Sequence, residues 1–527
     1  MSFKKIAAAV LVCAIILSIL PFGDVNADVH LPSLIRIGLY YASSAKAVYQ
    51  LSSESGYKIA YQDNNGNIKY IYNINAKDIS INKDDNFYLM AGTYNDQAGV
   101  DDALSKITLK VPNSLVGYDG NYHIFIGPYT NQNDASLAMK AFAVSYSDIK
   151  LVKPDVNISI LQNNKNIFLF CIKDFMYISK ISTDPTMLIN SKAYRGIFGF
   201  KRQTGSDMTA INVLTLEEYL YGVVPSEMPA SWNIEALKAQ AVASRTYAAK
   251  NTGKYSKYGF DLTDDVFCQV YKGYSNEYSN SNRAVDATKG VVAIYKGSLI
   301  DALFHSHSGG FTEDSENYFD NDVPYLKAVE DKYVFGYNKS DDRWSVNFSK
   351  DQIKQKLLCK KQDIGDIVDI KVTGKSWTGR ATEVTLYGTN GNYVLRKSKI
   401  RDFFDVKSTM LTIDGIKTAN DSNVYIQSNV DTVQKVLNGC YVVTANGTTQ
   451  IKSDIVYLIG QNGIKQINNQ KAASDVYIIN GSGNGHGIGL SQYGARGMAD
   501  NGYNYIDILK YYYKGIDLFD TINNKTL

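Results

Sequence analysis

Glu227 is the residue of this sequence best suited to move a single proton. It stands between Pro225 and Pro229, and each proline fixes its own φ and restricts the residue before it. We therefore predict a loop, bracketed by the prolines, that holds the Glu227 carboxylate in one position. An immobilised carboxylate can protonate a glycosidic oxygen and later accept a proton. The structural alternative is a surface glutamate beside a helix N-terminus, where negative charge is favourable.

Two helices are expected to position this loop. Upstream, Thr215 and Glu218 have the spacing of a capping box, which predicts a helix start. Downstream, Ser231 is the expected N-cap of a second helix. Apolar residues recur in that helix at helical spacing, at Ile234, Leu237, Ala241 and Ala248.

A glycine-rich block, GNGHGIGLSQYGARGMA, offers groups for ligand binding. Glycines allow a ligand to come close to the backbone, and His486 stands between two of them. Ser491 and Gln492 add neutral groups of the kind that bind sugar hydroxyls and N-acetyl groups. The GxxxxGK[ST] pattern of nucleotide-binding loops does not follow, which argues against a nucleotide site.

Two further blocks carry polar residues. FHSHSGGFT places His305 and His307 on one face of a strand, and DVFCQVYKGY contributes Cys268 and Gln269. These histidines, a cysteine and a distant histidine are residue types that bind zinc. Cys268 has no second cysteine or histidine nearby in the sequence. We therefore expect no metal or other cofactor, with zinc as the alternative.

These blocks resemble, in content and order, those of the SpoIID/LytB family of bacterial cell-wall proteins. The resemblance implies an α+β fold: a β-rich, multi-domain SpoIID core with a helix-flanked catalytic loop. The matching segments are AYRGIF, INVLTLEEYL, GVVPSEMPASWNIEALKAQAVASRTYA, DVFCQVYKGY, FHSHSGGFT, GKSWTGRATEV and NGHGIGLSQYGARGMADNGYNYIDILKYYYKGIDL.

The resemblance implies a lytic transglycosylase that cleaves the bond between N-acetylmuramic acid and N-acetylglucosamine in peptide-free glycan strands. The muramyl C6 hydroxyl would attack C1 and form a 1,6-anhydro ring, so no second catalytic carboxylate is needed. Glu227 would act first as the acid and then as the base. Desolvation by Val224, Met228 and Trp232 would raise its pKa, whereas a helix N-terminus would lower it. The residues carried over as substrate-binding are Arg245, Gln269, Ser308, Thr312, His486 and Gln492.

Two other functions stay open. LytB-type relatives resemble enhancers of a peptidoglycan amidase. The protein would then bind glycan, a cell-wall amidase or other sporulation wall-remodelling proteins without cutting. An inverting hydrolase would need a second carboxylate roughly 6.5–9.5 Å from Glu227, but Glu217, Glu218 and Glu235 are better explained as helix-start residues. The sequence does not distinguish sporulation from vegetative wall remodelling.

A repeat precedes most of the family blocks. NFYLMAGTYNDQ, from Asn86, aligns with NYHIFIGPYTNQ, from Asn121, and a helical segment follows each. Two strand–turn–helix halves predict a small pseudo-symmetric α+β unit. The pattern resembles the SPOR domain, which binds glycan strands lacking stem peptides; an unrelated α+β module is the alternative. Strand alternation puts only some of the candidates for its ligand face on that face; the candidates are Tyr88, Tyr94, Gln97, His123, Tyr129 and Gln132.

An exported protein of several domains is predicted. Lys4 and Lys5 precede an apolar run and the small residue Ala27, which is typical of a signal peptide. A retained N-terminal anchor is the alternative, with the protein at the cell wall or the outer face of the membrane. The expected segments are 1–27, signal peptide or anchor; 28–85, β-rich; 86–152, SPOR-like; 153–418, SpoIID core; 419–474, β-rich insertion; and 475–527, the glycine-rich block completing the core.

Composition agrees with a large folded protein. The 527 residues are 45% hydrophobic and 20% charged, with a net charge of +3. A charge this small argues against nucleic-acid binding. The cysteines after the signal, expected to be buried free thiols because their spacing specifies no pairing, are Cys171, Cys268, Cys359 and Cys440.

Overall fold

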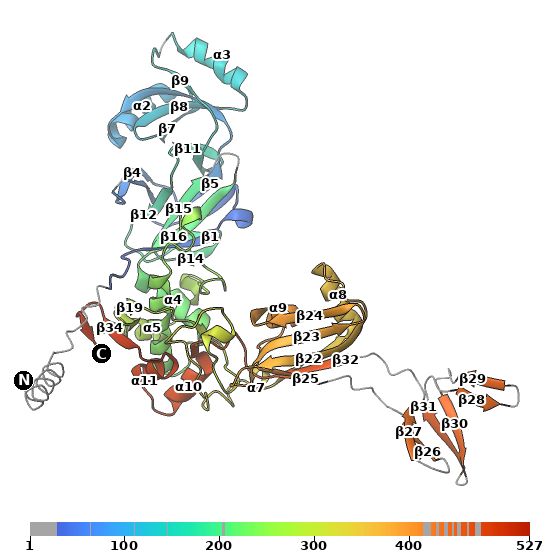
Figure 1. The fold of residues 1–527 in the computed structure, drawn as a ribbon. Helices are drawn as coiled ribbons and strands as arrows, with labels where there is room; N and C mark the ends of the chain where they lie inside the picture. Colours follow the sequence, from blue (N-terminus) through green and yellow to red (C-terminus); the bar gives the residue numbers. More distant parts are fainter. Residues whose placement is uncertain are drawn as a thin grey trace, which may run out of the picture. The chain divides into compact units, whose positions relative to one another are not determined.

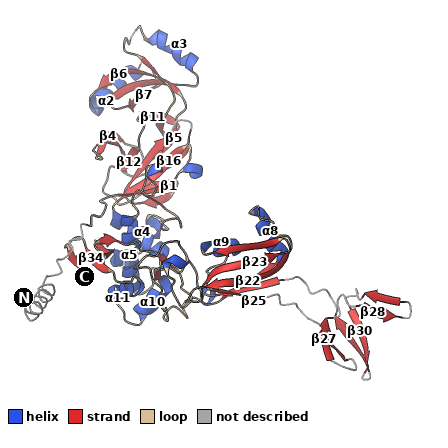
Figure 2. Ribbon diagram, in the orientation of Figure 1, coloured by secondary structure: helices blue, strands red, loops and turns tan. Residues whose placement is uncertain are grey.

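The computed structural model describes residues 29–63, 65–109, 111–144, 146–202, 206–414, 423–427, 432–436, 441–444, 447–450, 455–460, 463–468 and 476–527. The predicted α+β class is confirmed, because helices and strands alternate along the chain and the strands form mixed sheets (Figures 1 and 2). The predicted signal segment lies outside the described residues. Within them, no helix is both long and apolar enough to cross a membrane.

The chain divides into two compact units. The first runs to Ala302 and includes Asn504–Ile506 and Gly515–Leu527. The second comprises Leu303–Tyr503 and Asp507–Lys514.

The first unit contains a seven-stranded sheet in the order β17-β1-β16-β15-β12-β3-β4. Its core includes Ile211, Val213 and Phe260, all buried. The N-terminal strand β1 lies between two strands that follow the SPOR-like repeat in the sequence, so the repeat is inserted into the chain of this sheet. The strands are β1 (Ile35–Tyr40), β3 (Tyr57–Gln62), β4 (Ile68–Ile74), β12 (Met176–Lys180), β15 (Ile197–Arg202), β16 (Met208–Leu214) and β17 (Leu262–Thr263).

A ten-stranded sheet of the first unit contains the repeat, in the order β14-β13-β2-β5-β10-β11-β7-β8-β6-β9. The two repeat strands, β6 and β8, pair side by side. A helix follows each of them: α2 (Gln97–Thr108), capped by Asp96, and α3 (Gln132–Phe142), capped by Asn131. The strands are β2 (Val48–Ser52), β5 (Asp78–Lys83), β6 (Phe87–Tyr94), β7 (Ser114–Tyr118), β8 (Tyr122–Tyr129), β9 (Lys150–Val152), β10 (Ile158–Gln162), β11 (Lys165–Phe170), β13 (Met187–Ile189) and β14 (Lys192–Tyr194).

The proline-bracketed segment lies at the end of one helix and before the next, in a group of three packed helices of the first unit. These are α4 (Leu216–Glu227), α5 (Ile234–Lys250) and α6 (Ser279–Ala287). Beside α5, a small sheet has the order β19-β18-β34-β35. Its strands are β18 (Val291–Tyr295), β19 (Ser298–Leu299), β34 (Asp517–Asp520) and β35 (Lys525–Thr526). The end of the chain thus completes a sheet of the first unit.

The second unit has its own core, in which buried residues such as Ile353, Leu386 and Phe403 pack together. One sheet has the order β21-β32-β25, another β22-β23-β24, and β20 pairs with β33. The strands are β20 (Phe304–His305), β21 (Trp344–Ser349), β22 (Ile367–Lys375), β23 (Ala381–Gly388), β24 (Gly391–Arg396), β25 (Leu411–Asp414), β32 (Val476–Gly481) and β33 (Leu490–Ser491). The helices are α7 (Lys339–Asp342), α8 (Lys350–Cys359), α9 (Ser398–Phe404), α10 (Gln492–Asp500) and α11 (Tyr505–Tyr512), most of which belongs to this unit.

The predicted β-rich insertion, 419–474, is described only at its strands. These pair as three hairpins, namely β26 (Asn423–Gln427) with β27 (Thr432–Val436), β28 (Tyr441–Thr444) with β29 (Gly447–Gln450), and β30 (Ile455–Gly460) with β31 (Gly463–Asn468).

The cysteine prediction is partly wrong. Cys171, Cys268 and Cys359 are free thiols, as expected. Cys171 and Cys268 are only half-buried, and Cys359 is exposed because it ends the surface helix α8. Cys440 lies outside the described residues.

Candidate active site

Glu227 is the last residue of helix α4, so the predicted proline-bracketed loop is wrong in its extent. The capping box of Thr215 and Glu218 forms as predicted and starts the helix. Pro225 lies inside the last turn. The helix ends because Pro229 disfavours the helical conformation for the residue before it, and Met228 is extended, with φ −128° and ψ 135°. One proline therefore terminates the helix directly after Glu227.

The next helix, α5, begins later than expected. Its N-cap is Asn233, whose side chain accepts a hydrogen bond from the Glu235 backbone N–H. The predicted cap, Ser231, lies before the helix start. Helix α5 packs against α4, and nearly all of its residues after Glu235 are buried. Glu227 therefore lies at a junction of two helices, as expected, but at the C-terminus of the first.

The backbone N–H of Val270 holds the Glu227 carboxylate, donating to Oε1 at 3.0 Å. Val270 belongs to the DVFCQVYKGY block, so the fold brings this block to the glutamate. The amide favours the ionised carboxylate, whereas the C-terminal end of a helix carries partial negative charge and disfavours it. Two of the expected apolar neighbours in sequence, Val224 and Met228, are fully buried.

Gln269 lies in the interior of the first unit. Its side chain is 1% exposed; Oε1 accepts from the Tyr219 hydroxyl at 3.3 Å, and Nε2 donates to the Ser244 carbonyl at 3.4 Å. These bonds fix the segment that carries Val270 to helices α4 and α5. The expected substrate contact of Gln269 stays a prediction.

Arg245 is fully buried on α5 and pairs with Glu217 of α4. A guanidinium has five N–H donors. Here Nε and Nη2 donate to the two Glu217 oxygens, and the other contacts go to Thr288 and to the carbonyls of Val285 and Val291. The geometry therefore favours a positioning role for Arg245 over the direct substrate contact expected from the resemblance.

In the second unit, the two histidine-containing blocks lie side by side. Strand β20, from FHSHSGGFT, pairs in parallel with β33 of the glycine-rich block, and His307 bridges to Asn484. The glycine-rich segment packs tightly, since a Cβ on Gly487 would come within 2.5 Å of the Arg380 guanidinium carbon. Glycine is therefore required at position 487, because a larger residue would collide with the Arg380 side chain.

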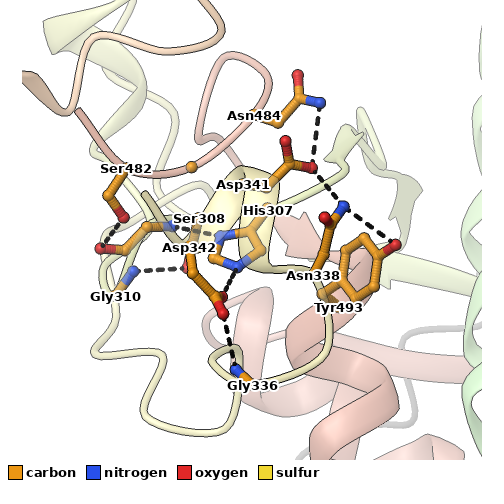
Figure 3. A network of polar contacts seen from close by, with 12 residues as sticks. His307, Ser308, Gly310, Gly336, Asn338, Asp341, Asp342, Ser482, Asn484 and Tyr493 are labelled. Atoms are coloured by element: carbon orange, nitrogen blue, oxygen red, sulfur yellow. Dashed lines mark hydrogen bonds and ion pairs between the residues drawn. The ribbon is translucent and has the colours of Figure 1, made fainter. Parts of the chain in front are cut away.

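His307 is the centre of a polar network (Figure 3). Its Nε2 faces Asp342 Oδ1 at 3.0 Å, and its Nδ1 accepts from the Gly309 backbone N–H at 3.1 Å. The Ser308 hydroxyl donates to Asp331 at 2.7 Å. His307 is fully buried and both its ring nitrogens are engaged, so its role here is to order the glycine turn.

The rings of His305 and His486 lie close together, with centroids 5.5 Å apart. Burial lowers the pKa of His305 well below its usual value. Burial, with Arg401 and Arg380 nearby, lowers the pKa of His486 to about 4. His486 Nδ1 accepts from the Ile488 backbone N–H at 3.0 Å. Neutral imidazoles at these positions can donate and accept hydrogen bonds but add no positive charge.

The remaining predicted contacts are largely buried in the second unit. Ser308 and Thr312 are fully buried, and the Thr312 hydroxyl accepts from the Val329 backbone N–H at 2.8 Å. Gln492 begins helix α10 and is 7% exposed. Substrate binding by these residues stays a prediction.

No group of three or more His, Cys, Asp or Glu side chains that could hold a metal ion is found in the part of the chain that the structure describes. Metal independence itself stays a prediction.

Comparison with known proteins gives three profile matches. The profile described as Stage II sporulation protein (SpoIID) matches residues 204–295, the SPOR domain matches 83–149, and a domain of unknown function, DUF8618, matches 327–428. An uncharacterized protein of Brachyspira hyodysenteriae is 31% identical over 314 residues, which are 59% of this chain and 69% of the relative. The chain belongs to the SpoIID/LytB family.

Two further relatives of this SpoIID-family chain come from Bacillus subtilis (strain 168). The amidase enhancer is 37% identical over 307 residues, and stage II sporulation protein D is 29% identical over 328 residues. The match covers 40% of the amidase enhancer and 76% of stage II sporulation protein D. The chain thus spans less than half of the amidase enhancer.

The SpoIID profile contains only part of the predicted site. Glu227, Arg245 and Gln269 fall within its match and within the first unit. The other four predicted residues fall in the second unit and outside that match: Ser308, Thr312, His486 and Gln492. The fold brings together the members of the first group around α4 and α5, and joins the blocks of the second group through β20 and β33.

The SPOR domain of this SpoIID chain narrows the set of candidates for the ligand face. Tyr88 is fully buried and His123 nearly so. The Tyr88 hydroxyl donates to Asp84 at 2.7 Å, and His123 Nδ1 bonds the Gly92 carbonyl at 2.6 Å. These two side chains are structural because they point to the interior side of their strands.

Sequence reasoning missed Glu313 and Arg380. The Glu313 carboxylate accepts from the hydroxyls of Ser376 and Thr378, and Arg380 is buried with its Nε and Nη1 unpaired among the described residues. Arg380 stands in the GKSWTGRATEV block. The only signal for Arg380 in the sequence was a charged residue beside a glycine, Gly379, in a block with the pattern of a strand.

Proposed function

We propose that this SpoIID protein is a lytic transglycosylase that cleaves peptide-free peptidoglycan glycan strands during sporulation or wall remodelling. The single observation that carries the proposal is the Glu227 carboxylate, held by the Val270 amide at the end of α4. The relatives named stage II sporulation protein D support a role in sporulation.

In the proposed reaction, Glu227 protonates the glycosidic oxygen as the bond from muramyl C1 breaks. The muramyl C6 hydroxyl then bonds to C1, and Glu227 accepts the hydroxyl proton. The 1,6-anhydro ring forms, and the carboxyl group returns to its starting protonation state. Because the nucleophile belongs to the substrate, one carboxylate is sufficient.

The first unit would contribute positioning groups to this reaction. The Val270 amide fixes the carboxylate, and Gln269 ties the Val270 segment to Tyr219 on α4. The Arg245–Glu217 pair clamps α5 to α4, the helix that ends at Glu227. The SPOR domain would concentrate the enzyme on glycan strands without changing the chemistry.

The second candidate is an enhancer of a peptidoglycan amidase, favoured by the 37% identity to the amidase enhancer. Incubating the purified protein with peptide-free glycan strands separates the two functions. A lytic transglycosylase should release anhydro-ended fragments, detected by mass spectrometry. Intact strands, together with faster cleavage by an added cell-wall amidase, would instead support the enhancer.

A further inference from the structure

A cavity of about 460 Å³ lies beside the end of α4 in the first unit. Pro225 and Pro229, which flank Glu227, contribute to its wall, and Asn276, Tyr278 and Asn280 form another part. Its volume falls in the range of roughly 300–1,000 Å³ that holds small-molecule ligands. None of the described residues that line it is charged, which disfavours an ionic ligand.

Two side-chain amides in the wall have fixed orientations. Asn276 donates Nδ2 to the Ser226 hydroxyl at 2.8 Å, and this hydroxyl in turn donates to the Gly222 carbonyl. Asn280 donates Nδ2 to the Ala230 carbonyl at 2.7 Å. Hydrogen bonds within the protein therefore hold both side chains in place along the wall. Asn276 thus bonds the residue directly before Glu227.

Tyr278 adds an aromatic surface, because its side chain is 55% exposed although it lines the cavity. A tyrosine ring presents an apolar face and a polar hydroxyl. The proline rings supply further apolar surface. Apolar faces combined with neutral hydrogen-bonding groups match a sugar ring, which carries C–H faces and a rim of hydroxyls.

We propose that this cavity is a saccharide subsite that holds an N-acetylated hexosamine of the glycan strand, with Tyr278 stacking on the sugar. The inference deepens the proposed function and rests on it for the identity of the strand. The subsite would position the strand in the first unit and affect substrate binding more than the chemical step.

Trp232 provides a local probe, since Asn280 Nδ2 also contacts its carbonyl at 3.4 Å. The chain has three tryptophans, and Trp344 and Trp377 belong to the second unit. In full-length Glu227→Gln protein labelled with 5-fluorotryptophan, a soluble oligomer of β-1,4-linked N-acetylglucosamine should shift the Trp232 ¹⁹F signal saturably. Trp232→Phe assigns this signal.

Substitutions at Tyr278 then test whether its aromatic ring contributes to binding of the oligomer. Tyr278→Ala should weaken the oligomer's affinity about five- to tenfold, whereas Tyr278→Phe should retain it. Tyr70→Ala is the matched control, because Tyr70 on β4 of the same unit is 57% exposed and lies outside the cavity. A deacetylated oligomer should bind more weakly than the N-acetylated one.

The outcomes for the subsite and for the enzyme are separable. No Trp232 shift, or equal affinity in Tyr278→Ala and Tyr70→Ala, would overturn the subsite even if the wild type cleaves glycan. A Tyr278-dependent Trp232 shift in a protein whose wild type releases no anhydro products would support the subsite and contradict the transglycosylase.

Discussion

The backbone N–H of Val270 donates to Oε1 of Glu227 at 3.0 Å and joins two segments that are 43 residues apart in the sequence. A backbone amide is a donor that no substitution except proline removes. The position of the carboxylate therefore depends on the path of the Asp265–Tyr271 segment as well as on the end of α4.

Removing this donor should impair catalysis. Val270→Pro lacks the N–H, and loss of a hydrogen bond to a charged group costs about 1.5–3 kcal/mol, which corresponds to a fall in kcat of roughly ten- to a hundredfold. Val270→Ala keeps the amide and serves as the control. Steady-state kinetics on glycan strands, with thermal unfolding to verify folding, measure the effect. Equal kcat in the two variants would show that the bond does not position the carboxylate.

Arg245 should contribute to stability rather than to substrate affinity. Arg245→Met leaves the partly buried Glu217 and the Val285 and Val291 carbonyls without their donor. Removing one partner of a buried pair costs about 3–5 kcal/mol, which urea unfolding should detect. A double change to Met at both Glu217 and Arg245 should recover part of the loss. Unchanged stability with a raised KM would instead indicate that Arg245 contacts substrate.

Stability should fall in mild acid because of His486. Its pKa of about 4 in the folded state lies below the value of about 6.5 expected when unfolded. Between these values the unfolded chain binds the proton more tightly, so folding free energy is lost as the pH falls from about 6.5 toward about 4. His305 acts in the same direction. Asp331 has the opposite effect, because burial raises its pKa and its protonation therefore adds stability as the pH falls. This effect begins from the ordinary pKa of a carboxyl group, which is lower than that of histidine.

Comparison with His486→Gln isolates this contribution. Between pH 7 and pH 5 the wild type should lose about 2 kcal/mol more unfolding free energy than the variant, measured by urea titration at each pH. Parallel losses in both proteins would show that His486 is not held neutral in the fold.

The SPOR domain should retain the protein on peptide-free glycan. Strands β6 to β9 occupy one end of their sheet, so deletion of residues 86–152 leaves β11 as an edge and the other strands paired. The deletion should weaken retention on peptide-free sacculi while turnover of short soluble glycans changes little. A pull-down assay measures retention. Equal retention with and without the domain would exclude a targeting role.

Local patterns predicted local structure well. The capping box of Thr215 and Glu218 formed because both of its bonds lie within one turn, and the SPOR repeat formed paired strands and capped helices because each half carries its own signals. The end of α4 was harder to predict, since two prolines stand close together. Pro225 is tolerated in the last turn, and Pro229 terminates the helix through its effect on Met228.

Contacts between residues far apart in the sequence could not be predicted from the sequence. The partner of Arg245 is Glu217, which was interpreted only as a helix-start residue, and their pairing depends on how α4 packs against α5. The Val270 amide has no side-chain signature at all. The cavity lined by Asn276, Tyr278 and Asn280 forms only where α6 meets the end of α4. Tertiary packing decides which residues meet at these places, and the spacing of residues in the sequence does not predict that packing.

The central claim is that Glu227 carries the acid–base step, and Glu227→Gln tests it most directly. The matched control is Glu218→Gln on the same helix, because glutamine also completes a capping box. Turnover of peptide-free glycan strands is measured for both variants by mass spectrometry of anhydro-ended products. The account predicts that Glu227→Gln still binds the strands but yields no product, while Glu218→Gln cleaves at nearly the wild-type rate. Appreciable anhydro product from Glu227→Gln would contradict it.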